Sequence, residues 1–261
     1  MPRLAANLTM MFNEVDVLDR IAAARAAGFH AVEYLFPYDL PKAEFAARLK
    51  AEGLQQVLIN APPGNWEKGE RGLASLPGRK AEFRAAISMA LDYAQALDCP
   101  QIHVMSGVLP PGSNPATYRA VMVENLVWAA EQARKCAVSL LLEPLNPVDF
   151  PGYLVDSVPA ALGIISAVGA ENVGLQYDLY HAQMMQGRLA QTLKDHFSFI
   201  HHIQVAGVPG RNEPDKSQEI NLPFLFSLLD ELGYAGWVGC EYRPRAGTKA
   251  GLAWAKAWGI G

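Results

Sequence analysis

The sequence is poor in cysteine, and no long hydrophobic run occurs in it. Its three cysteines, Cys99, Cys136 and Cys240, are far apart and form no Cys-x-x-Cys pair. This pattern argues against both a disulfide framework and a zinc knuckle. Charged or turn residues interrupt every apolar stretch before it reaches membrane-spanning length. The first residues pass directly into a strand-like run without a signal-peptide pattern. Together these absences predict a reduced, cytoplasmic protein that does not enter a membrane.

An excess of positive charge is also missing. Lysine and arginine number 22 against 26 acidic residues, which gives a net charge of −4 and an isoelectric point near 5.9. There is therefore no electrostatic case for binding nucleic acid or an anionic membrane. Half of the chain is hydrophobic and 18% is charged, which allows a large core and excludes extended disorder. No linker or shift in composition divides the 261 residues, so one domain over 1–261 is expected.

Short apolar runs alternate with amphipathic helical stretches along the whole chain. The expected strands are 4–8, 31–35, 54–59, 101–105 and four more that end at residues 143, 178, 204 and 241. The expected helices are 15–27, 41–52, 78–97, 114–136, 158–168, 181–196, 222–232 and 248–258. Strands that alternate with helices form parallel sheets. Eight such units in about 250 residues predict an α/β fold of the closed (β/α)₈ TIM-barrel type. A doubly wound open sheet is the alternative, but it usually has fewer strands and no GxGxxG follows the first strand here.

Four consecutive strands each end in an oxygen-bearing side chain. The clearest is Ser139–Pro144, a short apolar run that ends in Glu143. A carboxylate at the end of a buried strand needs a partner, a metal ion or a cavity. The next three strands end in Asp178, Gln204 and Glu241. Because the carboxyl ends of barrel strands share one rim, these four side chains are expected to meet there.

Three carboxylates and one amide are hard oxygen donors. Such donors favour Mg²⁺ or Mn²⁺, and zinc fits less well because no thiolate or imidazole dominates the set. Without a cation, three neighbouring carboxylates would repel one another and raise their pKa values. The simpler alternative is that each is a rim residue paired with a lysine or an arginine. Four in register at successive strand ends favour a divalent metal site instead.

A metal ion flanked by two glutamates suits proton abstraction next to a carbonyl group. The ion stabilises the enediolate, one carboxylate removes the proton and the other returns it. Glu143 and Glu241 are the expected catalytic acid/base pair. Asp178 and Gln204 are the expected further metal ligands beside these two glutamates. The sequence alone leaves open which glutamate removes the proton.

Several other polar residues are candidates for the same rim. His181 follows Asp178 at the start of a helix and is expected to donate a hydrogen bond to a substrate oxygen, with a helix cap or a solvated side chain as the alternative. Arg211, in the loop after Gln204, is a candidate for pairing with a substrate carboxylate, with an ordinary surface arginine as the alternative.

Three more polar residues carry weaker expectations. His202 is expected to lie deeper, behind the ligands. His103 is expected to be a core histidine with satisfied hydrogen bonds. Glu33, at the end of the second strand, is a weaker rim candidate.

The residues at these strand ends resemble the hydroxypyruvate isomerase family, within the larger group of xylose-isomerase-like barrels. The segments that carry the resemblance are 6–8, 58–64, 67–70, 142–146, 178–181, 202–205, 208–211, 213–214 and 239–242. The resemblance implies a TIM barrel that interconverts hydroxypyruvate and 2-hydroxy-3-oxopropanoate. It also implies acid/base roles for Glu143 and Glu241, and metal ligation by these two residues with Asp178 and Gln204. Related ketose 3-epimerases usually carry a histidine where Gln204 stands, which favours the isomerase branch.

One segment departs from the family pattern. Members commonly read E-P-I-N-T-R after the fifth strand, whereas Glu143–Val148 reads E-P-L-N-P-V, so that Val148 replaces the arginine. If that arginine binds the substrate carboxylate, then Arg211, or Arg243 and Arg245, must serve instead. Otherwise the substrate differs. A 2-oxo-tetronate isomerase and a ketose 3-epimerase are therefore the alternatives on the same barrel.

Two further classes of protein are less consistent with the sequence. Apurinic endonucleases on this barrel use a histidine-rich site with several zinc ions, whereas this chain has six histidines and an acidic charge. A non-catalytic sugar-acid-binding barrel would not need to retain all four ligands. The expected partner is thus a small 2-oxo or hydroxy acid, with no nucleic acid and no membrane. The sequence does not fix the oligomeric state and leaves a homo-oligomer open.

Overall fold

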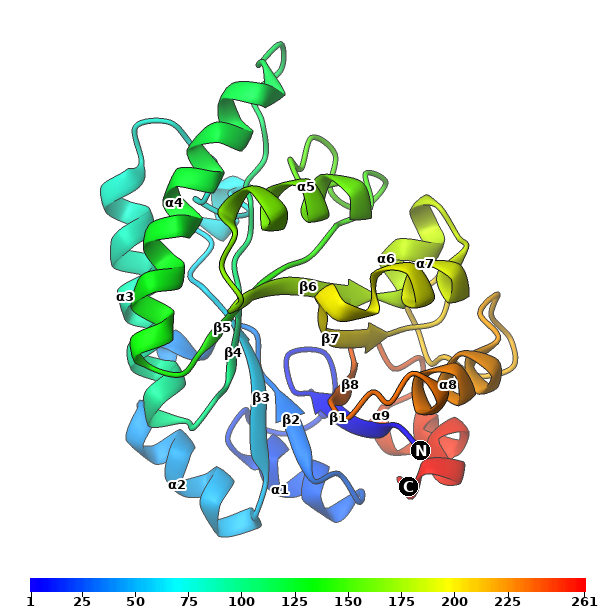
Figure 1. Cartoon of the computed structure of the whole chain (residues 1–261). Helices are drawn as coiled ribbons and strands as arrows, with labels where there is room; N and C mark the ends of the chain where they lie inside the picture. Colours follow the sequence, from blue (N-terminus) through cyan, green and yellow to red (C-terminus); the bar gives the residue numbers. More distant parts are fainter.

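Eight parallel strands close into one barrel, in which each strand pairs with the next and β8 returns to β1 (Figure 1). The structure, a computed structural model, describes residues 1–261. The strands are β1 (Arg3–Asn7), β2 (Ala31–Glu33), β3 (Gln55–Asn60), β4 (Gln101–His103), β5 (Ser139–Leu142), β6 (Val173–Asp178), β7 (Ile200–Val205) and β8 (Trp237–Cys240). The predicted TIM barrel is confirmed.

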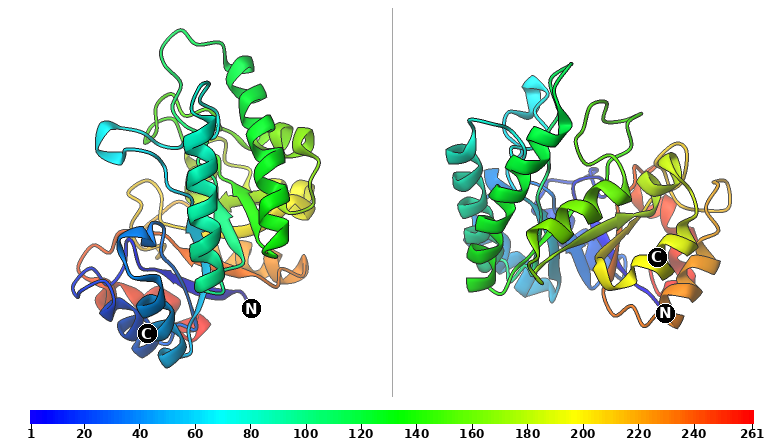
Figure 2. Two further views of the ribbon diagram at one scale, coloured as in Figure 1. Left: turned by 90° about the vertical axis from the view of Figure 1, so that its left-hand side faces the viewer. Right: turned by 45° about the horizontal axis from the view of Figure 1, so that its top comes forward.

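The helices form an outer layer around the barrel. They are α1 (Asp19–Ala26), α2 (Lys42–Glu52), α3 (Lys80–Ala96), α4 (Pro115–Lys135), α5 (Val158–Val168), α6 (Leu179–Met185), α7 (Leu189–His196), α8 (Leu222–Glu231) and α9 (Thr248–Gly251). The long helices α3 and α4 run side by side along one flank (Figure 2). No helix combines the length and the apolar character that crossing a membrane requires.

Two predicted helices differ from the structure. The helix expected over 181–196 is two helices, α6 and α7, because the chain turns between Gln186 and Arg188. Gly187 and Arg188 both have positive φ values, 61° and 51°, which a continuous right-handed helix does not allow. The helix expected over 248–258 is α-helical only to Gly251, and Leu252–Trp258 continues as a 3₁₀ helix.

The alternation of side chains along β5 positions the site. Leu140 and Leu142 belong to the large core between the barrel and the helices. Leu141 belongs instead to a small cluster with Ala5 and Ala31. Successive side chains of a strand point to opposite faces, so Leu141 and Glu143 share the inner face of the barrel. Glu143 therefore enters the barrel mouth directly after the strand ends.

Candidate functional site

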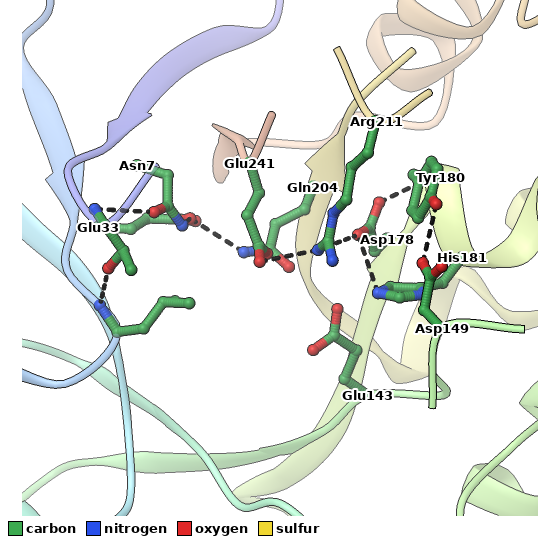
Figure 3. A network of polar contacts seen from close by, with 12 residues as sticks. Asn7, Glu33, Glu143, Asp149, Asp178, Tyr180, His181, Gln204, Arg211 and Glu241 are labelled. Atoms are coloured by element: carbon green, nitrogen blue, oxygen red, sulfur yellow. Dashed lines mark hydrogen bonds and ion pairs between the residues drawn. The ribbon is translucent and has the colours of Figure 1, made fainter. Parts of the chain in front are cut away.

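A cavity of about 270 Å³ opens at the carboxyl ends of the strands. Its lining comes from segments that follow several different strands, as expected for a site at the mouth of a TIM barrel. The polar residues of the lining are Thr9, Asn60, His103, Glu143, His181, Arg211, Glu241 and Arg243. Figure 3 shows Asp178, Arg211 and Glu241 facing one another, with Glu143 beside them. The structure thus brings the predicted acid/base residues and both predicted substrate-binding residues to one place.

Three residues of this site are arranged as a metal-binding cluster. Glu143, Asp178 and His181 each offer a ligand atom, and these atoms all lie within 4.8 Å of one another. All three side chains are buried. Glu143 Oε1, Asp178 Oδ2 and His181 Nε2 have no hydrogen-bond partner. Because unpartnered buried polar atoms are costly, a bound cation or substrate is the simplest way to satisfy them. The residues present therefore fit a divalent metal ion.

Local structure orients Asp178 and His181. Asp178 is the N-cap of α6, and its Oδ1 accepts a hydrogen bond of 2.8 Å from the Tyr180 backbone N–H. This leaves Oδ2 directed away from the helix end. The backbone N–H of Asn146 donates to His181 Nδ1 over 3.1 Å. Burial lowers the pKa of His181 well below its usual value, so the ring is neutral and carries its proton on Nε2. His181 thus presents an N–H donor to the site, so in this tautomer the carboxylates of Glu143 and Asp178, and not Nε2, are the atoms of the cluster that would hold a cation.

Arg211 lies among the carboxylates and is itself buried. Its Nη2 donates to Glu241 Oε1 over 2.8 Å and lies 3.6 Å from Asp178 Oδ2. Its guanidinium also stacks over the Tyr180 ring, with 5.0 Å between Cζ and the ring centroid. The surface-arginine alternative for Arg211 is therefore wrong. The guanidinium instead balances part of the negative charge of the site.

The burial of three carboxylates changes their proton affinities. Burial, together with the nearby charges of Glu241 and Asp178, raises the pKa of Glu143 well above its usual value. Burial raises the pKa of Glu241 to about 8 and that of Asp178 to about 6, although Arg211 opposes both shifts. The carboxyl groups therefore hold protons more strongly than exposed ones do. A divalent cation would reverse these shifts.

Gln204 is held by a buried network beneath the rim. Its Nε2 donates to Glu33 Oε2 over 2.9 Å, and its Oε1 accepts from Gln176 Nε2 over 2.6 Å. Glu33 also accepts from Asn7 Nδ2 over 3.0 Å and contacts His202. A carboxylate only accepts hydrogen bonds, so Glu33 fixes the amide nitrogen of Gln204 toward itself. The amide oxygen then faces the opposite way, where it accepts the hydrogen bond from Gln176.

The contacts of His202 and Glu33 bear on two of the sequence predictions. His202 contacts Glu33 and does not line the cavity, which agrees with the deeper position predicted for it. Glu33 supports Gln204 and does not line the cavity either.

Gly239 makes room for this network. A Cβ atom at position 239 would overlap the carboxylate of Glu33, which is buried and hydrogen-bonded. We expect Gly239→Ala to lower the free energy of unfolding by about 2 kcal/mol or more, because the network must shift or break. Gly163→Ala is the matched control, since nothing lies within 4 Å of its added methyl group in α5. Denaturant unfolding measures both. Equal stability of Gly239→Ala and the wild type would contradict this account of the network.

The structure corrects the prediction for His103. The ring is 1% exposed, but neither of its nitrogens has a hydrogen-bond partner, so it is not a satisfied core histidine. Its Nδ1 lies 3.4 Å from Glu143 Oε2, and the ring lines the cavity.

The predicted strand 101–105 is too long, because β4 ends at His103. The histidine therefore stands at the rim, where Asn60 of β3 also lines the cavity and was likewise not predicted as a site residue.

Comparison with known proteins agrees with this geometry. Residues 21–258 match a family model described as "Xylose isomerase-like TIM barrel". A 2-oxo-tetronate isomerase of Cupriavidus necator is 53% identical over 258 residues, with 99% of each chain covered. A hydroxypyruvate isomerase of Escherichia coli is 42% identical over 254 residues, with 97% of this chain and 98% of that protein covered.

A solved structure is similarly close. It belongs to a protein named as an AP endonuclease, family 2, from Brucella melitensis, and it superposes with a TM-score of 0.96 at 46% identity, covering 99% of both chains. The family model, the two enzymes and this structure all extend over nearly the whole chain. The chain therefore belongs to the xylose isomerase-like TIM-barrel family, in the group of hydroxypyruvate and 2-oxo-tetronate isomerases.

Proposed function

We propose that the protein is a metal-dependent 2-oxo-tetronate isomerase. The observation that carries this proposal is the order of similarity: three relatives named 2-oxo-tetronate isomerase are 45–53% identical, above the Escherichia coli hydroxypyruvate isomerase at 42%. The sequence alone favours hydroxypyruvate, with 2-oxo-tetronate as the alternative. The loss of the family arginine at Val148 also favours a substrate other than hydroxypyruvate. Both substrates are 2-oxo acids with a hydroxyl on C3, so the same chemistry serves either.

The reaction exchanges the carbonyl at C2 and the hydroxyl at C3. Glu143 and Glu241 approach the cavity from β5 and β8, and as a pair they can remove the proton from C3 and deliver one to C2. The Nε2–H of His181 is available to a substrate oxygen that gains negative charge. A Mg²⁺ or Mn²⁺ ion held by Glu143, Asp178, Gln204 and Glu241 would supply positive charge beside the two substrate oxygens.

Arg243 is the best-placed cation for the substrate carboxylate. Arg245 is engaged, because its Nε donates to Glu213 Oε2 over 2.8 Å and it also pairs with Asp215. Arg211 is engaged with Glu241. Arg243 lines the cavity and its guanidinium has no ion-pair partner. Its backbone is fixed, since its N–H donates to the Arg211 carbonyl over 2.8 Å. These contacts support a role for Arg243 in place of the missing family arginine.

The test is a direct comparison of two substrates. Protein reconstituted with Mg²⁺ or Mn²⁺ is incubated with 2-oxo-tetronate or hydroxypyruvate in D₂O, and NMR follows the products and their deuterium content. We expect kcat/KM for 2-oxo-tetronate to exceed that for hydroxypyruvate by about tenfold or more. Deuterium in the product indicates proton transfer through an enediolate. A preference for hydroxypyruvate, or no turnover of either acid, would refute the proposal.

The name of the Brucella melitensis protein makes a nuclease the second candidate. The site supports this function less well. It offers one cluster with a single histidine, and the chain has a net charge of −4. A DNA-backbone enzyme usually carries a basic surface. Incubation of the same metal-loaded protein with a duplex that contains an abasic site separates the two functions, and we expect no cleavage.

A further inference from the structure

Asn60 and His103 form a second polar group in the cavity, beside Glu143, whose Oε2 lies 3.4 Å from His103 Nδ1. They are Cα partners at the ends of the neighbouring strands β3 and β4. Both line the cavity, and their side chains are 5% and 1% exposed. Asn60 Oδ1 and both ring nitrogens of His103 have no hydrogen-bond partner. Buried polar atoms without partners are rare in folded proteins, and at a cavity wall they indicate a ligand that satisfies them.

The backbone holds this pair in place. The Asn60 N–H donates to the Leu35 carbonyl over 2.8 Å, and the Tyr38 hydroxyl donates to the Asn60 carbonyl. The Ala61 N–H donates to the His103 carbonyl over 2.8 Å. These bonds fix the two strand ends, so the side chains are presented by rigid elements. Such a site can select a substrate group by position.

The pair lies across the barrel from the charged groups that follow β7 and β8, while Glu143, after β5, stands beside His103. In a closed barrel ordered β1 to β8, β3 and β4 stand across from β7 and β8. Arg211, Glu241 and Arg243 follow β7 and β8. A substrate with its carboxylate at Arg243 and its reacting carbons at the glutamates therefore directs its other end toward Asn60 and His103. In a four-carbon acid that end is a hydroxymethyl group at C4. Hydroxypyruvate has no carbon beyond C2 and C3, which are its reacting carbons, so it has no such group.

We propose that Asn60 and His103 bind the terminal hydroxymethyl group of a four-carbon sugar acid. This inference rests on the proposed function and names the residues that distinguish four carbons from three. A hydroxyl donates one hydrogen bond and accepts others. Asn60 Oδ1 is an acceptor, and a neutral imidazole offers one donor and one acceptor. The pair therefore offers a hydroxyl group both a donor and an acceptor. A carboxylate only accepts hydrogen bonds, so it could not bind to Asn60 Oδ1, which is also an acceptor.

The test uses two acids that do not isomerise, threonate and glycerate, which differ by one hydroxyl-bearing carbon. Calorimetry measures their affinities for the Mg²⁺-loaded wild type and for Asn60→Leu, His103→Leu and His103→Gln. We expect the wild type to bind threonate roughly tenfold more tightly than glycerate. In both leucine variants the ratio should fall to within about twofold of one, because an apolar group cannot bind the hydroxyl. His103→Gln should restore part of the ratio through its amide.

Three comparisons keep the outcome unambiguous. His30→Leu removes an exposed histidine far from the cavity and should leave the ratio unchanged. If His103→Leu does not fold, Asn60→Leu alone decides. A wild type without preference for threonate, or leucine variants that retain it, would overturn the inference. A retained threonate preference without turnover of 2-oxo-tetronate would overturn the proposed function and leave this subsite standing.

Discussion

Glu143→Gln and Glu241→Gln should each lower kcat for 2-oxo-tetronate by about 10³-fold or more. General acid–base catalysis contributes about 10² to 10⁴-fold, and each variant also removes a carboxylate from the proposed metal site. Both side chains are buried at the cavity, and glutamine has nearly the same shape as glutamate, so the fold should persist. Steady-state kinetics with metal in excess measures the loss. Exchange of the C3 hydrogen with solvent deuterium then identifies the base, because only the variant that lacks the base should lose exchange from this substrate.

Glu131→Gln is the matched control for both variants. Glu131 is an exposed glutamate of α4, remote from the cavity, and its substitution should leave kcat within about twofold of the wild type. Circular dichroism and metal content confirm that each variant is folded and loaded. If the glutamine variant of either buried glutamate lost less than tenfold in kcat, that glutamate would not belong to the acid/base pair.

Metal affinity should rise steeply with pH. The pKa of Glu241 is raised to about 8 and that of Asp178 to about 6, mainly by burial. Below these values the ion must displace protons, so Kd should fall by up to about tenfold per pH unit for each proton released, until pH exceeds about 8. Calorimetry in buffers with different ionisation enthalpies counts the protons. A Kd that is constant between pH 6 and pH 8.5 would show that these carboxyls are not the ligands.

The same shifts fix the sign of the stability change in metal-free protein. A carboxyl group whose pKa is higher in the folded than in the unfolded chain stabilises the fold at low pH. For Glu241 this stabilisation is complete below pH 4.5, near the unfolded pKa, and it is lost as the pH rises through the folded pKa of about 8. Metal-free protein should therefore unfold at a lower temperature at pH 9 than at pH 6. Added Mg²⁺ should raise the unfolding temperature more at pH 9. Chelation should abolish turnover at both pH values, and readdition of the ion should restore it.

Much of the fold can be predicted from the sequence because polar or turn residues follow the apolar run of each strand. Asp178 is a good example: it closes β6 and caps α6, so one residue signals both boundaries. Errors occur where local signals continue past a boundary. Val104 and Met105 extend the apolar run of β4 and are buried, but the strand ends at His103. A single glycine, Gly187, does not distinguish a helix break from a tolerated residue inside a helix.

The candidate site was only partly predictable for a different reason. Strand ends on one arc, such as Glu143 and Asp178, follow from the spacing of strands along the chain. Contacts across the barrel do not, because they join strands that are not neighbours. Glu33 of β2 accepts a hydrogen bond from Gln204 of β7 in this way, and no sequence pattern in either segment predicts this contact. The open hydrogen-bonding capacity of His103 likewise depends on where the cavity lies.

The placement of Asn60 and His103 on β3 and β4 has a consequence for how such an enzyme diversifies. The proposed proton-transfer and metal-binding side chains all lie on or directly after β5 to β8, in the second half of the chain, while this pair comes from the first half. Chain length of the substrate and chemistry at its reacting carbons are thus encoded in separate stretches of the gene. A small library of variants at positions 60 and 103 should therefore change which sugar acids are bound, while the residues proposed for catalysis remain unchanged.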